Sequence, residues 1–104
     1  GNFPLWLSPQ QLIVLPINEK VNNYATEINN KLLEAGFRSS IDSRFEKISR
    51  KIRDAEIKKI PYMIIIGENE KESNTISVRK KSKGDIGRMD INDFLNRLKN
   101  ELIK

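Results

Sequence analysis

The sequence contains neither cysteine nor histidine among its 104 residues. The chain therefore cannot form disulfides or zinc sites built from cysteine and histidine, and it lacks thiolate nucleophiles and imidazole acid–base groups. Serines such as Ser8 and Ser39 have no histidine to activate them as nucleophiles. We therefore expect a domain with no catalytic residues, no metal site and no cofactor of its own.

Long apolar segments are also missing. The longest apolar run covers residues 62–66, whereas a membrane-spanning helix needs about 20 residues. The GxGxxG pattern of dinucleotide-binding proteins and the P-loop pattern are both absent. The length suits one domain with one hydrophobic core. We predict a soluble, cytoplasmic protein that has no membrane partner.

Positive charge is concentrated in two parts of the chain. The 19 Lys and Arg residues exceed the 14 Asp and Glu residues by five. Residues 44–59 contain seven basic and three acidic side chains, and residues 79–88 contain five basic and one acidic side chain, so these two segments carry the whole excess. Such clustering favours contact with RNA or DNA. For any single basic residue, a solvated surface with pairs such as Arg50 with Asp54 is the alternative.

Hydrophobic periodicity predicts alternating strands and helices. Strands are expected at residues 11–15, 37–42, 62–67 and 75–80, of which the third is the most apolar and therefore the centre of the sheet. Helices are expected from Asn18 to Gly36, around the apolar stripe of Ile48, Ile52 and Ala55, and from Asp90 onwards. The remaining segments 68–74 and 81–89 are expected to be loops, the second basic, exposed and flexible. The order β-α-β-α-β-β-α predicts an α/β fold with a single mixed sheet and helices on its faces.

Three stretches of the chain carry distinctive strings. The first is FPLWLSPQQ at residues 3–11. The second combines DSR at 42–44, EKI at 46–48, KIRDAE at 51–56 and KIPYM at 59–63, and the third combines ISVR at 76–79 with DIG at 85–87 and Met89. In this order and spacing they resemble the C-terminal anticodon-binding domain of threonyl-tRNA synthetases, which are class II aminoacyl-tRNA synthetases. Prolyl-, glycyl- and histidyl-tRNA synthetases share some of these features, so their anticodon-binding domains are an alternative.

The resemblance implies a fold, a partner and a missing domain. The family's domain has a mixed sheet of about five strands, mostly parallel with one antiparallel, and three flanking helices. It holds the anticodon loop of threonine tRNA and reads chiefly the middle guanine and the third uracil. Residues 1–10 would be the linker from an absent catalytic domain, and residues 11–104 the anticodon-binding domain. ATP and zinc would belong to that catalytic domain of the same polypeptide, and the parent ligase would be a homodimer.

The resemblance also assigns residues to base reading. Arg53 on the outer face of the second helix, Glu70 in the loop after the central strand and Arg79 on the wet face of the next strand match positions that contact anticodon bases. A carboxylate can accept from the N1 and N2 donors of guanine, and arginines can donate to base oxygens or phosphates. Phe45 stands where the family usually has asparagine. It could stack on a base, which is worth about 1–3 kcal/mol, or it could pack on the domain.

Further basic residues would hold the RNA backbone without reading sequence. They are Arg44, Lys47, Arg50, Lys51, Lys80, Lys81 and Lys83. We place Arg44 on the second helix, together with Arg50 and Arg53. Two other classes of function stay open. A non-specific RNA-binding or protein-docking module could use the same fold, and its RNA-binding form would show steep salt dependence without base preference. A small-molecule enzyme of doubly wound type would need an activating group that the sequence lacks.

Overall fold

A five-stranded sheet with the strand order β2-β1-β3-β4-β5 organises the computed structural model, which describes residues 5–81 and 83–103. The strands are β1 (Leu12–Pro16), β2 (Ser39–Ile41), β3 (Tyr62–Ile66), β4 (Ile76–Lys80) and β5 (Gly84–Met89). The helices are α1 (Asn22–Glu34), α2 (Ile48–Ile57), α3 (Glu68–Ser73) and α4 (Ile91–Ile103), with short 3-10 helices at Leu5–Leu7 and Glu19–Val21.

Strand direction confirms the predicted mixed sheet. β1 pairs in parallel with β2 and with β3, whereas β4 is antiparallel to β3 and β5 is antiparallel to β4. Four strands therefore run in one direction and β4 alone is reversed. The most apolar strand, β3, lies at the centre of the sheet as predicted. A strand whose two faces are both covered by helices favours apolar side chains on both sides.

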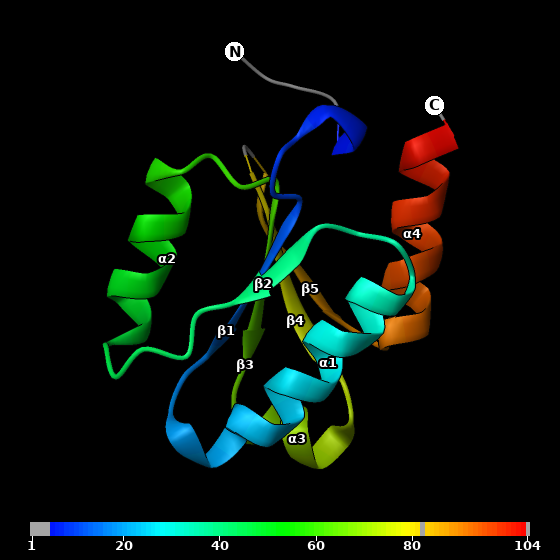
Figure 1. Ribbon diagram of the computed structural model, residues 1–104. Coiled ribbons are helices and arrows are strands. Elements are labelled where there is room, and N and C mark those ends of the chain that lie inside the picture. The colour runs from blue at the N-terminus through cyan, green and yellow to red at the C-terminus, as the bar shows by residue number, and fades with distance from the viewer. Residues whose placement is uncertain (1–4, 82, 104) are drawn as a thin grey trace.

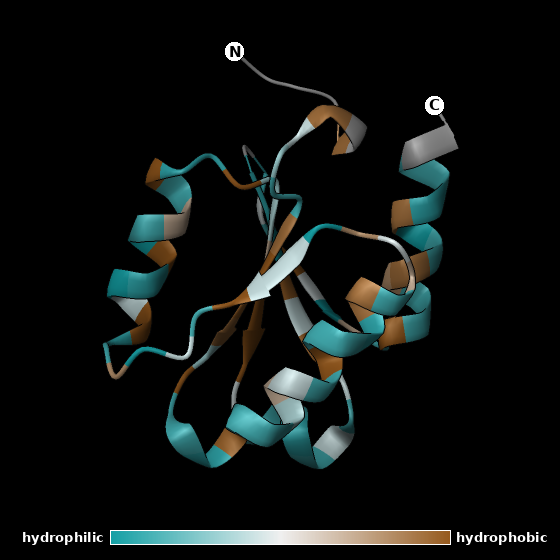
Figure 2. Cartoon of the chain, in the orientation of Figure 1, coloured by the Kyte–Doolittle hydropathy of each residue, from teal (hydrophilic) through white to brown (hydrophobic). Residues whose placement is uncertain are grey.

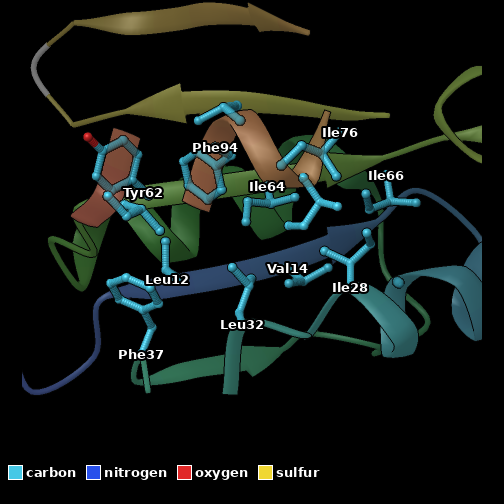
Figure 3. Packing of buried hydrophobic residues seen from close by; sticks show 14 of the residues in the cluster. Leu12, Val14, Ile28, Leu32, Phe37, Tyr62, Ile64, Ile66, Ile76 and Phe94 are labelled. Atoms are coloured by element: carbon cyan, nitrogen blue, oxygen red, sulfur yellow. The ribbon is translucent and has the colours of Figure 1, made fainter. Parts of the chain in front are cut away.

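The helices cover the two faces of the sheet unequally. Figure 1 shows α2 on one face and α1 with α4 on the other. The larger apolar cluster lies under α1 and α4, and Figure 3 shows part of it, with Leu12 and Val14 of β1 beside Ile28 and Leu32 of α1. A smaller cluster lies under α2, where Ala55 packs against β1 and β3. In Figure 2 the hydrophobic colours are concentrated on β1 and β3 and alternate with hydrophilic colours along the helices, as expected for amphipathic helices on a sheet.

Helix α3 corrects the predicted loop at residues 68–74. Gly67 precedes the helix, and its N–H donates to Glu70 Oε1 at 2.7 Å, while Asn74 ends the helix in the left-handed conformation with φ of 60°. Such terminal contacts stabilise short helices. The prediction of a loop was wrong because these six residues contain no apolar side chain, so they have no hydrophobic period to detect.

Strand β5 corrects the predicted flexible loop at residues 81–89. The strand begins at Gly84 and includes Gly87, with φ of 76° and 107° respectively, and its register against β4 shifts between Val78 and Arg79. Glycine tolerates these dihedrals, and strand glycines often mark such irregularities. Ile86 and Met89 pack against the larger core cluster. The chain therefore turns at residues 81–83, of which residue 82 lies outside the described part, and returns along β4.

The residues before β1 pack onto the domain. Leu5 belongs to the larger core cluster, and Gln11 Nε2 donates to the Leu5 carbonyl oxygen at 3.0 Å. Residues 1–4 lie outside the described part of the chain. The expectation that residues 1–10 link to a catalytic domain stays a prediction. A search of the described helices finds none that combines the length and the apolar character of a membrane-spanning segment.

Candidate nucleic-acid interface

A crevice opens at the carboxyl ends of two neighbouring parallel strands. The chain leaves β1 towards α1 on one face of the sheet and leaves β2 towards α2 on the other face (Figure 1). Diverging connections of this kind form the usual ligand crevice of open α/β sheets. Residues of the segments 17–22 and 43–47, together with Lys51, line a cavity of about 690 Å³ at this place.

Phe45 stands at the edge of the crevice with 96% of its surface exposed. The alternative in which Phe45 packs on the domain is therefore wrong. A phenylalanine of this exposure is uncommon on a protein surface, since the ring gains nothing from contact with water. Its open face is available for stacking on a base. A role of Phe45 in base reading stays a prediction.

Arg44 holds the segment that carries Phe45. It precedes α2, which corrects its predicted place on that helix. Its Nε and Nη2 donate to the two carboxylate oxygens of Asp42 at 2.8 Å each, and Nη2 also lies 2.8 Å from Asp54 Oδ2. These hydrogen bonds hold the pKa of both carboxyl groups below their usual values. Arg44 therefore clamps the crevice loop, and an RNA phosphate would have to compete with two carboxylates for its guanidinium group.

Acid should release this clamp. A carboxyl group whose pKa is lowered by folding stabilises the protein above its unfolded value of 3.8, and this contribution is lost as the pH falls through the folded value. We expect Arg44→Met to lower the free energy of unfolding relative to wild type at about pH 7, and the difference to shrink as the pH falls below 3.8. Urea unfolding followed by circular dichroism across this range measures it.

The control for the acid experiment is Arg50→Met, because Arg50 Nε lies 3.9 Å from Asp54 Oδ1, beyond hydrogen-bonding distance. We expect its pH profile to depart from that of wild type less than the profile of Arg44→Met does, because Arg50 lowers the pKa of Asp54 through its charge without a hydrogen bond. A destabilisation by Arg44→Met that is equal at all pH values would contradict the clamp.

Lys51 contradicts its predicted place among the exposed contacts to the RNA backbone. It is 2% exposed, and its Nζ donates to the Pro16 carbonyl oxygen at 2.9 Å, at the end of β1. Burial lowers the pKa of its ammonium group. The side chain ties α2 to β1 at the floor of the crevice, because an amine taken out of water needs an acceptor.

The second part of the candidate interface, after the crevice, is the sheet face beside α2. On this side α2 packs over β1 and β3, and the outer strands β4 and β5 keep half-buried and exposed residues. Arg79 pairs in register with Met63, which belongs to the α2-side cluster, so Arg79 has the predicted place on the wet face of its strand. In the described part of the chain its side chain has no hydrogen bond or ion pair. Its contact with bases stays a prediction.

Glu70 lies on α3, not in the loop where we predicted it, and only 7% of its surface is exposed. Its carboxylate already has three partners. Gly67 N–H donates to Oε1, Ser77 Oγ donates to Oε2 at 3.2 Å, and Arg88 Nη2 lies 3.1 Å from Oε2. Ser77 precedes Arg79 by two residues on β4, so both side chains are on the same sheet face. The carboxylate thus reaches the face of Arg79, and its predicted base contact is untested.

Lys80 points to the other face of the sheet. Its Nζ lies 3.1 Å from Glu101 Oε1 of α4 and 5.5 Å from the centroid of the Tyr62 ring. Alternation along the strand separates it from Arg79. The structure therefore does not join Lys80 to the other predicted RNA contacts.

Several predicted cations keep their charge available. Arg50 and Arg53 are exposed on α2, Lys47 lines the crevice, and Lys81 and Lys83 flank the turn between β4 and β5. Considering only residues 5–81 and 83–103, the side chains of Lys47, Arg53, Lys81 and Lys83 have no hydrogen bond or ion pair. Arg88 was assigned no role from the sequence, although it belongs to the second basic segment and was to that extent a candidate.

Both sequence and fold match known proteins. The family model described as anticodon binding domain matches residues 11–101. A threonine–tRNA ligase of Cytophaga hutchinsonii is 48% identical over 100% of this chain, which spans 16% of that relative. The crystal structure of the RNA binding domain of a threonyl-tRNA synthetase from Cryptosporidium parvum has a TM-score of 0.91 at 31% identity, covering 95% of this chain and 25% of that one.

A prolyl-tRNA synthetase from the same organism has a TM-score of 0.85 at 22% identity, covering 95% of this chain and 22% of that one, and so shares the fold. With 91 consecutive residues (11–101) matched by the family model, the chain belongs to the anticodon-binding domain family.

Proposed function

We propose that this domain binds the anticodon loop of threonine tRNA and reads its bases on behalf of a threonine–tRNA ligase. The observation that carries the proposal is the exposed ring of Phe45 beside a crevice lined by charged side chains, at the carboxyl ends of β1 and β2. The full-length relatives named threonine–tRNA ligase support the choice of amino acid. The domain contributes recognition, and the chemistry belongs to another part of the ligase.

The chemistry of the surface suits an RNA loop. Unstacked loop bases expose their edges and faces, which a duplex would hide. Phe45 offers a face for stacking, and Arg79 and Arg53 offer donors for base oxygens or phosphates. Glu70 offers acceptors for the donors of the middle guanine. Contacts to the RNA backbone come from lysines at the crevice and the β4–β5 turn, namely Lys47, Lys81 and Lys83.

The proposed function places this chain in a longer protein. The chain spans 16% of its relative from Cytophaga hutchinsonii. In our proposal a catalytic domain of the same polypeptide holds ATP and zinc and attaches threonine to the tRNA. A homodimeric parent protein in the cytoplasm completes the proposal. In the longer protein, substitutions on the surface described above should lower aminoacylation through the affinity for tRNA.

Binding to anticodon stem-loops tests the proposal. We expect the threonine stem-loop to bind about tenfold more tightly than one with adenine in place of the middle guanine, because a charge-assisted hydrogen bond contributes about 1.5–3 kcal/mol. Fluorescence anisotropy at two salt concentrations measures both affinities. Equal affinities with steep salt dependence would indicate a non-specific RNA-binding module. A preference for a proline, glycine or histidine anticodon would indicate a related synthetase, and absence of binding would indicate a protein-docking module.

A further inference from the structure

Arg88 of β5 contacts Glu70 from the solvent side. Its Nη2 lies 3.1 Å from Glu70 Oε2, and half of its side-chain surface is exposed, against 9% for Glu70. In the register of β4 and β5, Arg88 lies opposite Ser77, whose hydroxyl donates to the same carboxylate oxygen. The third partner, Gly67 N–H, is buried. Arg88 is therefore the partner of Glu70 that water reaches most easily.

The Glu70 carboxylate has too few unused acceptor positions for a guanine edge while Arg88 stays in place. Its two oxygens offer about four lone-pair positions in all. Gly67 N–H fills one position on Oε1, and Ser77 and Arg88 fill two on Oε2. A guanine that presents its N1 and N2 donors side by side needs one position on each oxygen. One donor on Oε2 must therefore leave, and the exposed Arg88 is the one free to move.

Resting on the proposed function, in which Glu70 accepts from the middle guanine, we propose that Arg88 is the exchangeable counter-ion of Glu70 and sets the strength of base discrimination. Without RNA, Arg88 neutralises the carboxylate. Guanine replaces the arginine with its own two donors. At the corresponding positions adenine has an acceptor at N1 and no amino group at C2, so adenine leaves the contact between Arg88 and Glu70 intact. Guanine breaks this ion pair and adenine does not. The preference for guanine over adenine is therefore smaller by the free energy of the ion pair.

Substitution of Arg88 by methionine tests the exchange. Methionine removes the charge and keeps an apolar stem of similar reach. Affinities are measured for two stem-loops that differ only in guanine or adenine at the middle position. We expect the ratio of the two affinities to rise about two- to fivefold in Arg88→Met, as follows from the strength of an exposed ion pair. Both affinities fall, because a positive charge is lost.

Arg50→Met is the matched control, since Arg50 is also exposed and its ion pair with Asp54 is long, at 3.9 Å. We expect it to lower both affinities equally and to leave the ratio unchanged. Thermal unfolding establishes that both variants are folded. A ratio that stays constant or falls in Arg88→Met, while wild type prefers guanine, overturns the exchange alone. Equal binding of both stem-loops by wild type overturns the proposed function and the exchange with it.

Discussion

Replacing Arg79 by alanine should weaken binding of the threonine anticodon stem-loop about 10- to 100-fold, because charge-assisted hydrogen bonds contribute about 1.5–3 kcal/mol and about 1.4 kcal/mol is a factor of ten. The side chain lies on the sheet face beside α2 and, within residues 5–81 and 83–103, has no internal partner. Among these described residues, its removal breaks no side-chain hydrogen bond or ion pair. We therefore expect the free energy of unfolding to stay within about 0.5 kcal/mol of wild type. Anisotropy titrations and urea unfolding measure the two quantities.

Lys80→Ala is the control for Arg79→Ala, since the two residues are adjacent and carry the same charge. Lys80 lies on the opposite face and interacts with Glu101 and the ring of Tyr62. We expect its removal to reduce stability slightly. RNA affinity should fall only by the small effect of losing one positive charge on the opposite face. If Lys80→Ala weakens binding as much as Arg79→Ala, the sheet face beside α2 is not the interface.

The elements that could be predicted from sequence are those with an uninterrupted hydrophobic pattern. β3 is a run of apolar residues, and α2 repeats Ile48, Ile52 and Ala55 on one side. Helix α3 and strand β5 have no such signal. The first is held by the bond from Gly67 N–H to Glu70, and the second contains two glycines with positive φ. Their formation depends on backbone geometry and on neighbouring strands, which a single sequence does not display.

The sequence could not show which cations are available to a partner, because the groups that bind the unavailable ones are distant in sequence. Lys51 bonds to the carbonyl of Pro16, 35 residues away, and Lys80 pairs with Glu101, 21 residues away. Counting charges in a segment treats such residues as equal to exposed ones. The two basic segments therefore overstate the charge that faces a partner, while the face of Arg79 was readable from strand alternation alone.

Phe45 is the residue whose substitution we expect to affect stacking most directly. Phe45→Ala should weaken stem-loop binding about 10- to 100-fold, since base stacking on an aromatic ring is worth about 1–3 kcal/mol. The ring is 96% exposed, so its removal leaves no cavity and the free energy of unfolding should not change. Anisotropy measures affinity, and circular dichroism follows unfolding.

Two variants separate stacking from hydrophobic contact at this position. Phe45→Trp keeps an aromatic face and should retain most of the affinity, whereas Phe45→Leu keeps apolar area without a π-face and should lose most of it. Leu33→Ala is the control for loss of an exposed apolar side chain on α1, outside the crevice. Equal affinity of Phe45→Leu and wild type would show that the ring acts as an apolar surface only. Arg44 then serves to place a hydrophobic contact beside the crevice, and base stacking is not part of recognition.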